Sequence, residues 1–216
     1  MMSTPAHPFT LASWRREVAE LYAGMRNTAQ RDPKLAAAQF RAGRDSLILH
    51  HVESPLTPAV ARAIDYFPYD PTWRLTGTID RDVDRYQFQI DLAGDGVLRC
   101  TRAGVVRFAY NGADLALSVF WMEGYGGGLW LPFGDLTNND ESYGGGRYLY
   151  DSIKGADLGA GSDPSGNTML LDFNFAYNPS CAYDHRWSCP LSPPENKLAL
   201  AVRAGERAYP QAAALG

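Results

Sequence analysis

Apolar residues recur at helical spacing near the start of the chain. They follow one another at steps of three or four residues, which places them on one face of a helix over about three turns. Ser13 directly precedes the run and is a residue type that caps helix N-termini. We therefore predict a helix that starts at Ser13 and packs through this stripe. The stripe consists of Trp14, Val18, Leu21, Tyr22 and Met25.

A second helix is predicted directly afterwards. Asp32 is followed by Pro33, a combination of a capping side chain and a proline at the first helical position. The residues that follow, up to Phe40, favour helix. Gly43 is a residue of low helix propensity, and we expect the helix to fray there.

The character of the chain changes at Ser54. Four prolines fall within the next eighteen residues and disfavour helix, while large apolar residues among them, including Phe67 and Trp73, are costly to leave in water. This composition predicts an ordered, extended segment. Short β-like runs follow, at residues 73–79, 86–92, 97–101, 105–110, 114–121 and 129–133.

Turn signals between these runs predict the fold class. A-G-D-G at 93–96 and N-G-A-D at 111–114 favour hairpins, and the alternation in 86–92 places its apolar residues on one face. Consecutive hairpins predict an antiparallel β-barrel or β-sandwich, covered at one side by the two helices. We thus expect a mainly β, α+β protein with a helical segment at 1–52 and an antiparallel β domain with long ordered loops at 53–216.

Composition narrows the range of partners. The formal net charge of the 216-residue chain is -4, and no basic cluster exceeds Arg15-Arg16, which argues against nucleic acid. No apolar run is long enough to span a membrane, and the first nine residues lack a secretion signal. We therefore predict a cytoplasmic protein that binds a small molecule, with a homodimer as one possible state.

Three segments carry a resemblance to a known family. Residues 130–149 (W-L-P-F-G-D-L-T-N-N-D-E-S-Y-G-G-G-R-Y-L), 171–181 (L-D-F-N-F-A-Y-N-P-S-C) and 189–198 (C-P-L-S-P-P-E-N-K-L) resemble a bacterial and archaeal family of uncharacterised proteins, domain of unknown function 1684. Residues 43–56 and 65–74 resemble its entry segment more loosely. The resemblance implies a compact β-rich domain and no established reaction.

The first of these segments contains a polar cluster. Arg147 follows the carboxylates across a glycine-rich turn, so its guanidinium is a candidate clamp for a carboxylate or phosphate of a ligand. The alternative is a Glu141–Arg147 ion pair that only holds the loop. Tyr143 and Asn138 are further candidate ligand contacts. The polar cluster comprises Asp135, Asn138, Asp140, Glu141 and Arg147.

The loop also contains one of two similar glycine turns. Y-G-G-G-L-W-L at 125–131 is repeated as Y-G-G-G-R-Y-L at 143–149. Two copies are too few for a repeat architecture. Triple glycine is expected where the backbone needs positive φ or where another group approaches closely.

A second polar cluster lies in 171–181. If L-D-F-N forms a strand, Asp172 and Asn174 share one face, opposite the core. A carboxylate in the lumen of a barrel would have a raised pKa and would suit general-base work. The alternative is that Asp172, Asn174 and Asn178 satisfy backbone groups of the neighbouring loops.

The three cysteines allow several interpretations. Cys100 is expected to be a small buried residue in a strand. Cys181 and Cys189 could be structural thiols or a loop-closing disulfide, and a nucleophilic role is a further alternative. With His185, and with Asp184 as a further candidate, they also offer a spacing of the kind that zinc ligands have, but no fourth ligand is evident nearby. We predict no cofactor, with zinc at Cys181, His185 and Cys189 as the alternative.

Histidines 50 and 51 are adjacent, so in a strand only one of them could reach a given site. His51 is therefore a candidate for proton transfer. The sequence contains no P-loop, dinucleotide-binding glycine fingerprint, G-x-S-x-G elbow or H-E-x-x-H motif. Nucleotide-dependent chemistry is disfavoured.

Together these patterns favour a small enzyme that performs non-redox acid–base chemistry, such as hydrolysis, elimination or cyclisation, on a polar small molecule. Asp172 would be the general base, Glu141 a second acid and Arg147 the anion clamp, with Asn174 and Asn178 as hydrogen-bond donors. The alternative is a non-catalytic module that binds a small molecule or a protein. A preformed pocket containing Asp172 or Glu141 would favour the enzyme, whereas closed ion pairs at both carboxylates would favour the module.

Overall fold

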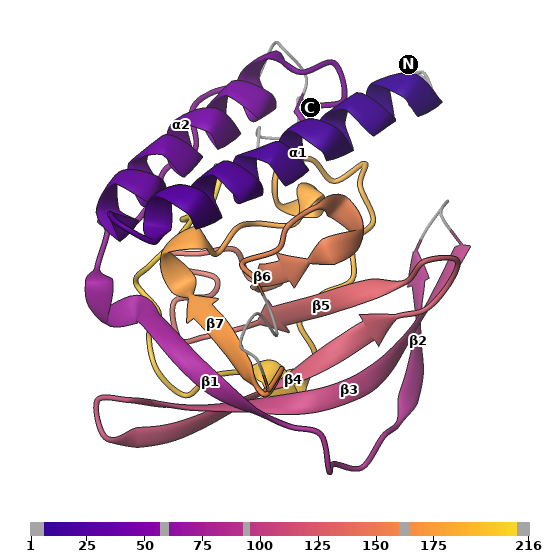
Figure 1. Cartoon of the computed structure of the whole chain (residues 1–216). Helices are drawn as coiled ribbons and strands as arrows, with labels where there is room; N and C mark the ends of the chain where they lie inside the picture. Colours follow the sequence, from indigo (N-terminus) through magenta and orange to yellow (C-terminus); the bar gives the residue numbers. More distant parts are fainter. Residues whose placement is uncertain (1–6, 57–60, 93–95, 160–164, 211–216) are drawn as a thin grey trace.

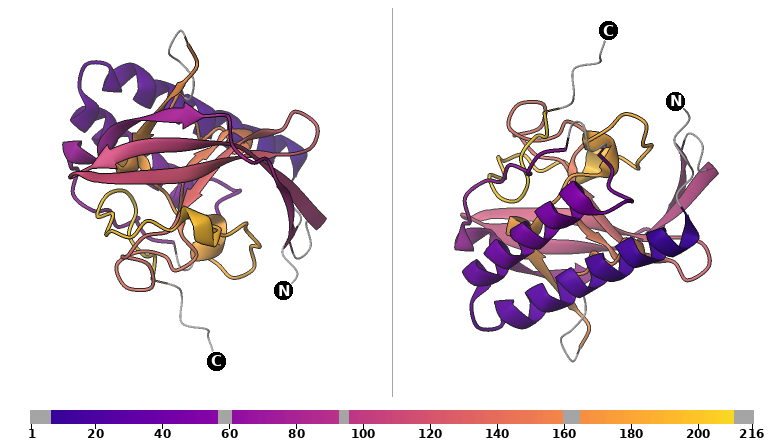
Figure 2. Two further views of the ribbon diagram at one scale, coloured as in Figure 1. Left: turned by 90° about the horizontal axis from the view of Figure 1, so that it is seen from below. Right: turned by 90° about the horizontal axis from the view of Figure 1, so that it is seen from above.

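Two helices cover one side of a curled antiparallel sheet that forms a half-barrel (Figures 1 and 2). The structure is a computed structural model and describes residues 7–56, 61–92, 96–159 and 165–210. The mainly β class with helices at one side, predicted from the sequence, is confirmed. Within the described residues, no helix combines the length and apolar character needed to cross a membrane.

Helix α1 spans Pro8–Ala29 and starts earlier than the apolar stripe indicates. The predicted start at Ser13 is wrong, because the ring of His7 caps the helix by accepting a hydrogen bond from the backbone N of Phe9. Pro8 then occupies the first helical position, where a proline is tolerated. Ser13 lies inside the helix and its hydroxyl bonds to Glu17.

Helix α2 spans Pro33–His50. Its predicted start is confirmed: the Asp32 carboxylate accepts a hydrogen bond from the backbone N of Leu35 at 2.9 Å. The predicted end near Gly43 is wrong, because this glycine lies against α1. A Cβ atom at this position would be only 2.6 Å from Leu21 Cδ1, so the missing side chain lets the two helices pack closely.

The sheet has the strand order β6-β5-β4-β3-β1-β7, and β2 pairs with the free part of β3. All pairings between these strands are antiparallel. The strands are β1 Arg74–Asp80, β2 Gln87–Leu92, β3 Gly96–Tyr110, β4 Ala113–Met122, β5 Gly128–Phe133, β6 Arg147–Asp151 and β7 Thr168–Asp172. Short 3₁₀ helices lie at η1 Pro71–Trp73, η2 Ser152–Lys154, η3 Phe173–Phe175, η4 Ser180–Ala182 and η5 Pro194–Asn196.

Strand β3 explains the curl of the sheet. The two predicted runs at 97–101 and 105–110 are one long strand, whose first part pairs with β2 and whose second part pairs with β1. The register of β3 against β4 shifts between Arg102 and Gly104, and such irregularities bend a strand. The hairpin predicted at N-G-A-D is confirmed by the pairing of Tyr110 with Ala113. The other predicted turn includes 93–95, which lie outside the described residues.

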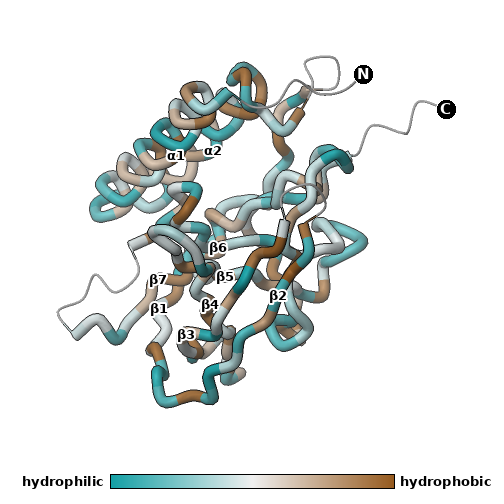
Figure 3. Tube along the Cα trace, turned by 90° about the vertical axis from the view of Figure 1, so that its right-hand side faces the viewer, coloured by the Kyte–Doolittle hydropathy of each residue, from teal (hydrophilic) through white to brown (hydrophobic). Residues whose placement is uncertain are grey.

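The helices and the half-barrel share one core. Tyr22 of α1 contacts Phe40 of α2 edge-on, and Phe40 contacts Phe175 of η3 in the same way, with both centroid distances at 5.1 Å. Apolar and polar residues alternate around the helices and along β2, as the sequence pattern indicates (Figure 3). The proline-rich segment before β1 is ordered where it is described, since Phe67 and Trp73 are buried.

A fully buried ion pair attaches the C-terminal segment to the sheet. The Arg147 guanidinium lies 2.8 Å from the Asp135 carboxylate and donates hydrogen bonds to the backbone oxygens of Val202, Ala204 and Glu206. Asp135 also accepts a bond from the backbone N of Val202. The Glu141–Arg147 pair considered from the sequence is therefore wrong.

Glu141 instead pairs with Arg203 at the surface, at 2.8 Å. Its partner is 63% exposed, so water screens this pair strongly. Burial lowers the pKa of the Arg147 guanidinium, and the Asp135 carboxylate opposes that change. Asp135 and Glu141 thus have different roles, because only the Asp135 carboxylate is buried.

We expect Arg147→Ala to lower the free energy of unfolding by about 3–5 kcal/mol, because it leaves the Asp135 carboxylate buried without its partner. Arg203→Ala is the matched control for an exposed pair and should change stability little. Urea unfolding followed by circular dichroism measures both. If Arg147→Ala does not fold, Arg147→Lys should still fold with reduced stability; wild-type stability in either Arg147 variant would contradict this role.

The two glycine turns provide a second comparison. Gly126 and Gly146 have almost the same positive φ, at 88° and 86°. A Cβ atom at Gly126 would meet nothing within 4 Å, whereas at Gly146 it would lie 2.6 Å from the backbone O of Phe133. Of these two matched positions, only Gly146 therefore combines the unusual backbone conformation with a close approach of backbone.

Gly146→Ala should therefore destabilise the protein clearly more than Gly126→Ala. Both variants carry the conformational cost of an L-residue at positive φ, about 1–2 kcal/mol, and Gly146→Ala adds a steric clash with backbone. Thermal unfolding of the two variants measured side by side tests this. Equal losses would mean that the strand shifts to accommodate the methyl group.

Candidate functional site

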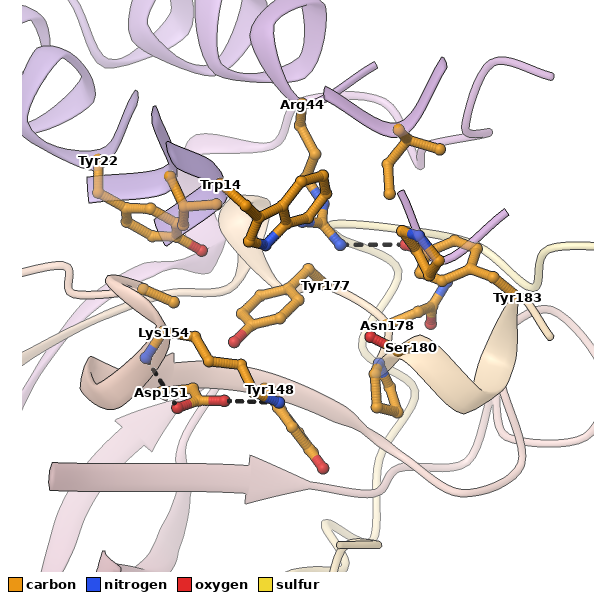
Figure 4. Close-up of a pocket in the computed structure, with 15 residues that line it drawn as sticks. Trp14, Tyr22, Arg44, Tyr148, Asp151, Lys154, Tyr177, Asn178, Ser180 and Tyr183 are labelled. Atoms are coloured by element: carbon orange, nitrogen blue, oxygen red, sulfur yellow. Dashed lines mark hydrogen bonds and ion pairs between the residues drawn. The ribbon is translucent and has the colours of Figure 1, made fainter. Parts of the chain in front are cut away.

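A cavity of about 60 Å³ lies between the two helices and the end of β6 (Figure 4). At roughly 10–15 Å³ per water-sized group, it has room for about four to six such groups. Aromatic side chains from three different parts of the chain form much of its wall. The residues that line it are Trp14, Val18, Tyr22, Arg44, Ile48, Pro55, Tyr148, Asp151, Lys154, Ala156, Tyr177, Asn178, Pro179, Ser180 and Tyr183.

Two buried polar atoms of this lining have no hydrogen-bond partner among the described residues: the Tyr22 hydroxyl and Asn178 Oδ1. The two residues are only 2% and 1% exposed. An unsatisfied buried polar atom costs about 1–3 kcal/mol, so native proteins usually provide a partner. Tyr22 and Asn178 lie on opposite sides of Tyr177 (Figure 4), which places a free hydroxyl at one end and a free carbonyl oxygen at the other.

An opposite-charge pair lies beside Tyr177 at the floor of the cavity (Figure 4). The Lys154 ammonium is 3.5 Å from the buried Asp151 carboxylate, and the backbone N of Lys154 donates to the same carboxylate at 3.3 Å. The Asp151 carboxylate raises the pKa of Lys154, which stays protonated. Because the ammonium is half exposed and has three donors, it can still bind an oxygen of a ligand.

On the opposite wall, the buried charges of Arg44 and Glu206 are paired with each other. The Glu206 carboxylate is completely buried and accepts hydrogen bonds from Arg44, from the Tyr183 hydroxyl and from the backbone N of Asn178. Asn178 is further fixed because its Nδ2 donates to the backbone O of Arg207 at 2.8 Å. Its remaining oxygen is therefore held in one position.

Asp172 and Asn174 do not line this cavity. Strand β7 ends at Asp172, so the predicted alternation does not continue to Asn174. The Asp172 carboxylate is 2.7 Å from Arg74, and Asn174 bonds to both the N and the O of Asp70 in the proline-rich segment. This matches the backbone-satisfying alternative. Burial raises the pKa of Asp172, as the sequence analysis anticipated for an enclosed carboxylate.

The other candidate residues predicted from the sequence lie in different parts of the structure. Arg147 has no exposed surface and is occupied by Asp135 and by backbone oxygens. Asn138 bonds within its own loop, to Asp135 N and Tyr143 O, and lines a separate open groove. Tyr143 donates to Cys181 Sγ at 3.5 Å. Among the predicted site residues, only Asn178 lines the cavity.

His51 is near the cavity without lining it. His50 ends α2 and His51 follows as its C-cap, so the strand geometry assumed for the two histidines is wrong. The His51 ring packs edge-on against Trp14 at 5.2 Å and its Nε2 is 3.5 Å from Glu17. Its contacts position Trp14, which does line the cavity.

The cysteine loop does not assemble a metal site. Among the described residues, no group of three or more His, Cys, Asp or Glu side chains is placed to hold a metal ion, and His185 is exposed. Cys181 and Cys189 are both free thiols, and Cys100 is fully buried as expected. The zinc alternative thus lacks a converging set of ligands.

Sequence reasoning missed most of the cavity. Trp14 and Tyr22 belong to the predicted apolar stripe, but their polar tips were not considered as ligand groups. Asp151 and Lys154 are three residues apart, and the intervening 3₁₀ helix η2 was not predicted. The apolar stripe of the first helix must pack on the β domain, and it contains Trp and Tyr, whose rings carry a polar N–H or O–H group. That combination could have indicated a ligand-binding surface.

Comparisons with known proteins place the chain in a family without assigning an activity. The model of a family described as "Protein of unknown function (DUF1684)" matches residues 61–207. An uncharacterized protein of Haloarcula marismortui, solved by solution NMR, is 30% identical, with a TM-score of 0.58 over 84% of this chain and 96% of the other. No curated protein matches. The family model covers well over half of the sequence, and the chain therefore belongs to the DUF1684 family.

Proposed function

We propose that the protein binds a small polar organic molecule in the cavity between the helices and β6. The observation that carries this proposal is that two residues lining this one cavity, Tyr22 and Asn178, each have a buried side-chain oxygen without a hydrogen-bond partner among the described residues. A bound molecule would satisfy both atoms at once. The aromatic walls favour an organic molecule over water alone, because flat rings bind carbon frameworks well.

The chemistry of the lining indicates a class of ligand. The Tyr22 hydroxyl at one end and the Lys154 ammonium beside Tyr177 supply donors, which suits a carboxylate or carbonyl oxygen of the ligand. Asn178 Oδ1 supplies an acceptor at the other end, which suits a hydroxyl or amino group. With room for about four to six non-hydrogen atoms, the cavity fits a short hydroxy- or amino-carboxylate.

Binding is favoured over the acid–base enzyme by the positions of the carboxylates. The general base proposed from the sequence, Asp172, is closed in an ion pair with Arg74, and Glu141 is closed in one with Arg203. Neither lines the cavity. Ion pairs that occupy both carboxylates are the arrangement expected of a non-catalytic binding module.

Acid–base chemistry remains a second candidate function, supported by the Asp151–Lys154 pair in the same cavity. A lysine whose pKa is raised by a neighbouring carboxylate is an acid or an electrostatic partner rather than a base. Prolonged incubation of a bound molecule with the protein, followed by NMR, distinguishes the two. A new product that is lost in Asp151→Asn would establish catalysis, and an unchanged ligand would establish binding alone.

We expect Tyr22→Phe to weaken binding about tenfold, since it removes one net hydrogen bond to the ligand. Glycolate, lactate, glycine and acetamide, screened by ligand-observed NMR and then by calorimetry, are suitable probes. Tyr66→Phe is the matched control: its hydroxyl is also buried and has no partner within the part of the chain that the structure describes, but Tyr66 does not line the cavity. Failure of every probe to bind, or equal effects of the two variants, would overturn the proposal.

The same variant makes a prediction for the free protein. Tyr22→Phe should not lower the free energy of unfolding without ligand, because the hydroxyl bonds to none of the residues that the structure describes. Tyr183→Phe should lower it by about 1.5–3 kcal/mol, because that hydroxyl bonds to the buried Glu206 carboxylate. Urea unfolding of both variants measures the difference. A large loss in Tyr22→Phe would show that its hydroxyl has a structural role.

A further inference from the structure

Cys181 and Cys189 lie in contact although no disulfide joins them. The backbone N of Cys181 donates to Cys189 Sγ at 3.3 Å, and the Tyr143 hydroxyl donates to Cys181 Sγ at 3.5 Å. A sulfur that touches the backbone of the other cysteine is close enough for a bridge after a side-chain rotation, because disulfides need Cα atoms within about 7 Å. The two thiols are thus a preformed pair.

The pair is electrostatically asymmetric. A hydrogen bond from Cys189 lowers the pKa of Cys181 to about 6, and the charge of Lys154 acts in the same direction. The same hydrogen bond raises the pKa of Cys189. The two shifts have opposite directions, which makes Cys181 the more acidic thiol of the pair. Cys100 differs from both, since burial raises its pKa to about 11.

The surroundings leave the pair reachable by a small oxidant. Cys189 is partly exposed and Cys181 is 8% exposed, whereas Cys100 has no exposed surface. The loop that joins the two cysteines carries the exposed His185 and Arg186, so it faces solvent. A thiolate with a neighbouring thiol in such a position has the arrangement of a redox-sensing cysteine next to its resolving partner.

We propose that Cys181 and Cys189 form a redox-active dithiol that a hydroperoxide converts reversibly to an intramolecular disulfide. The Cys181 thiolate attacks one peroxide oxygen; an S–O bond forms, the O–O bond breaks, and the departing hydroxide takes a proton to leave as water. The Cys189 sulfur then attacks the Cys181 sulfur; the S–S bond forms, the S–O bond breaks, and the hydroxyl leaves with the Cys189 proton as water. Overall, two thiols and hydrogen peroxide give a disulfide and two waters.

The two cysteines are next in sequence to residues that line the cavity, but their oxidation does not require a ligand in it. Pro179 and Ser180 line the cavity directly before Cys181. Directly after Cys189, the backbone O of Pro190 accepts a hydrogen bond from Tyr148, which also lines the cavity. A bridge across this loop therefore adjoins one cavity wall. The redox reaction itself stands apart from the proposed function.

The experiment uses the full chain, reduced and then treated with one equivalent of hydrogen peroxide. Free thiols are blocked with N-ethylmaleimide and located by peptide mass spectrometry. We expect Cys181 and Cys189 to escape blocking, joined in one disulfide, and to become reactive again after dithiothreitol. If both stay open to blocking after excess peroxide, the proposal is overturned.

Three variants assign the roles. Cys189→Ser should stop at a sulfenic acid on Cys181, which dimedone traps, and Cys181→Ser should slow oxidation about tenfold, because an ordinary thiol is mostly protonated at neutral pH. Cys100→Ser is the control and should behave like the unaltered chain. Equal oxidation rates in Cys181→Ser and the unaltered chain would assign the reaction to another group.

Two measurements on the unaltered chain also test the proposal. The rate of Cys181 alkylation should rise with pH to a plateau with a midpoint near pH 6, which matches the lowered pKa of this thiol. A midpoint near the ordinary thiol value of about 8.5 would count against the thiolate. Elemental analysis of the purified protein tests whether the two cysteines bind zinc instead. About one zinc per chain, released when Cys181 and Cys189 are modified, would overturn the redox role in favour of a metal site.

Discussion

The buried pair between Arg147 and Asp135 is the interaction on which the rest of the structure depends. Arg147 is on β6 and Asp135 is in the loop after β5, and together they bind the C-terminal segment at 202–206 through backbone hydrogen bonds. That segment has no strand or helix of its own. Its backbone groups are satisfied by these side chains and by the backbones of Phe67 and Ala176, because buried irregular chain needs such partners.

The C-terminal segment in turn supports residues that line the cavity. Once it is fixed, Glu206 projects its carboxylate into the space between α2 and the loop after η3. There it holds Arg44, Tyr183 and the backbone of Asn178. A charge buried in this way is costly unless it is paired and fully hydrogen-bonded, and Glu206 is both. Helix α2 and the cavity wall are thus connected to the sheet through one carboxylate.

Periodicity predicts the elements of this fold better than it predicts the contacts between them. The stripe in α1, the Asp32 cap and the hairpin at Asn111 follow from local chemistry, and the structure agrees. The partners of Arg147 and Asp172 could not be predicted, because each ion pair joins segments distant in sequence whose relative placement depends on the whole sheet. Glu141 illustrates this: six residues from Arg147, it pairs with Arg203 instead.

The distant residues that carry the family resemblance act mainly as connectors. Asn196 bonds to the N and O of Ser118 and to the O of Pro132, and Asn174 bonds in the same way to Asp70. Because the buried amides of Asn174 and Asn196 are so well hydrogen-bonded, we expect any buried amide that lacks a partner to have a function. Asn178, which lines the cavity with Tyr22, is held by the same kind of bonds, yet its Oδ1 has no partner among the described residues. A mobile amide would rotate until its oxygen accepted a hydrogen bond. Because the Asn178 amide is held in place, its unpartnered oxygen is better explained as a ligand-binding group than as a packing defect.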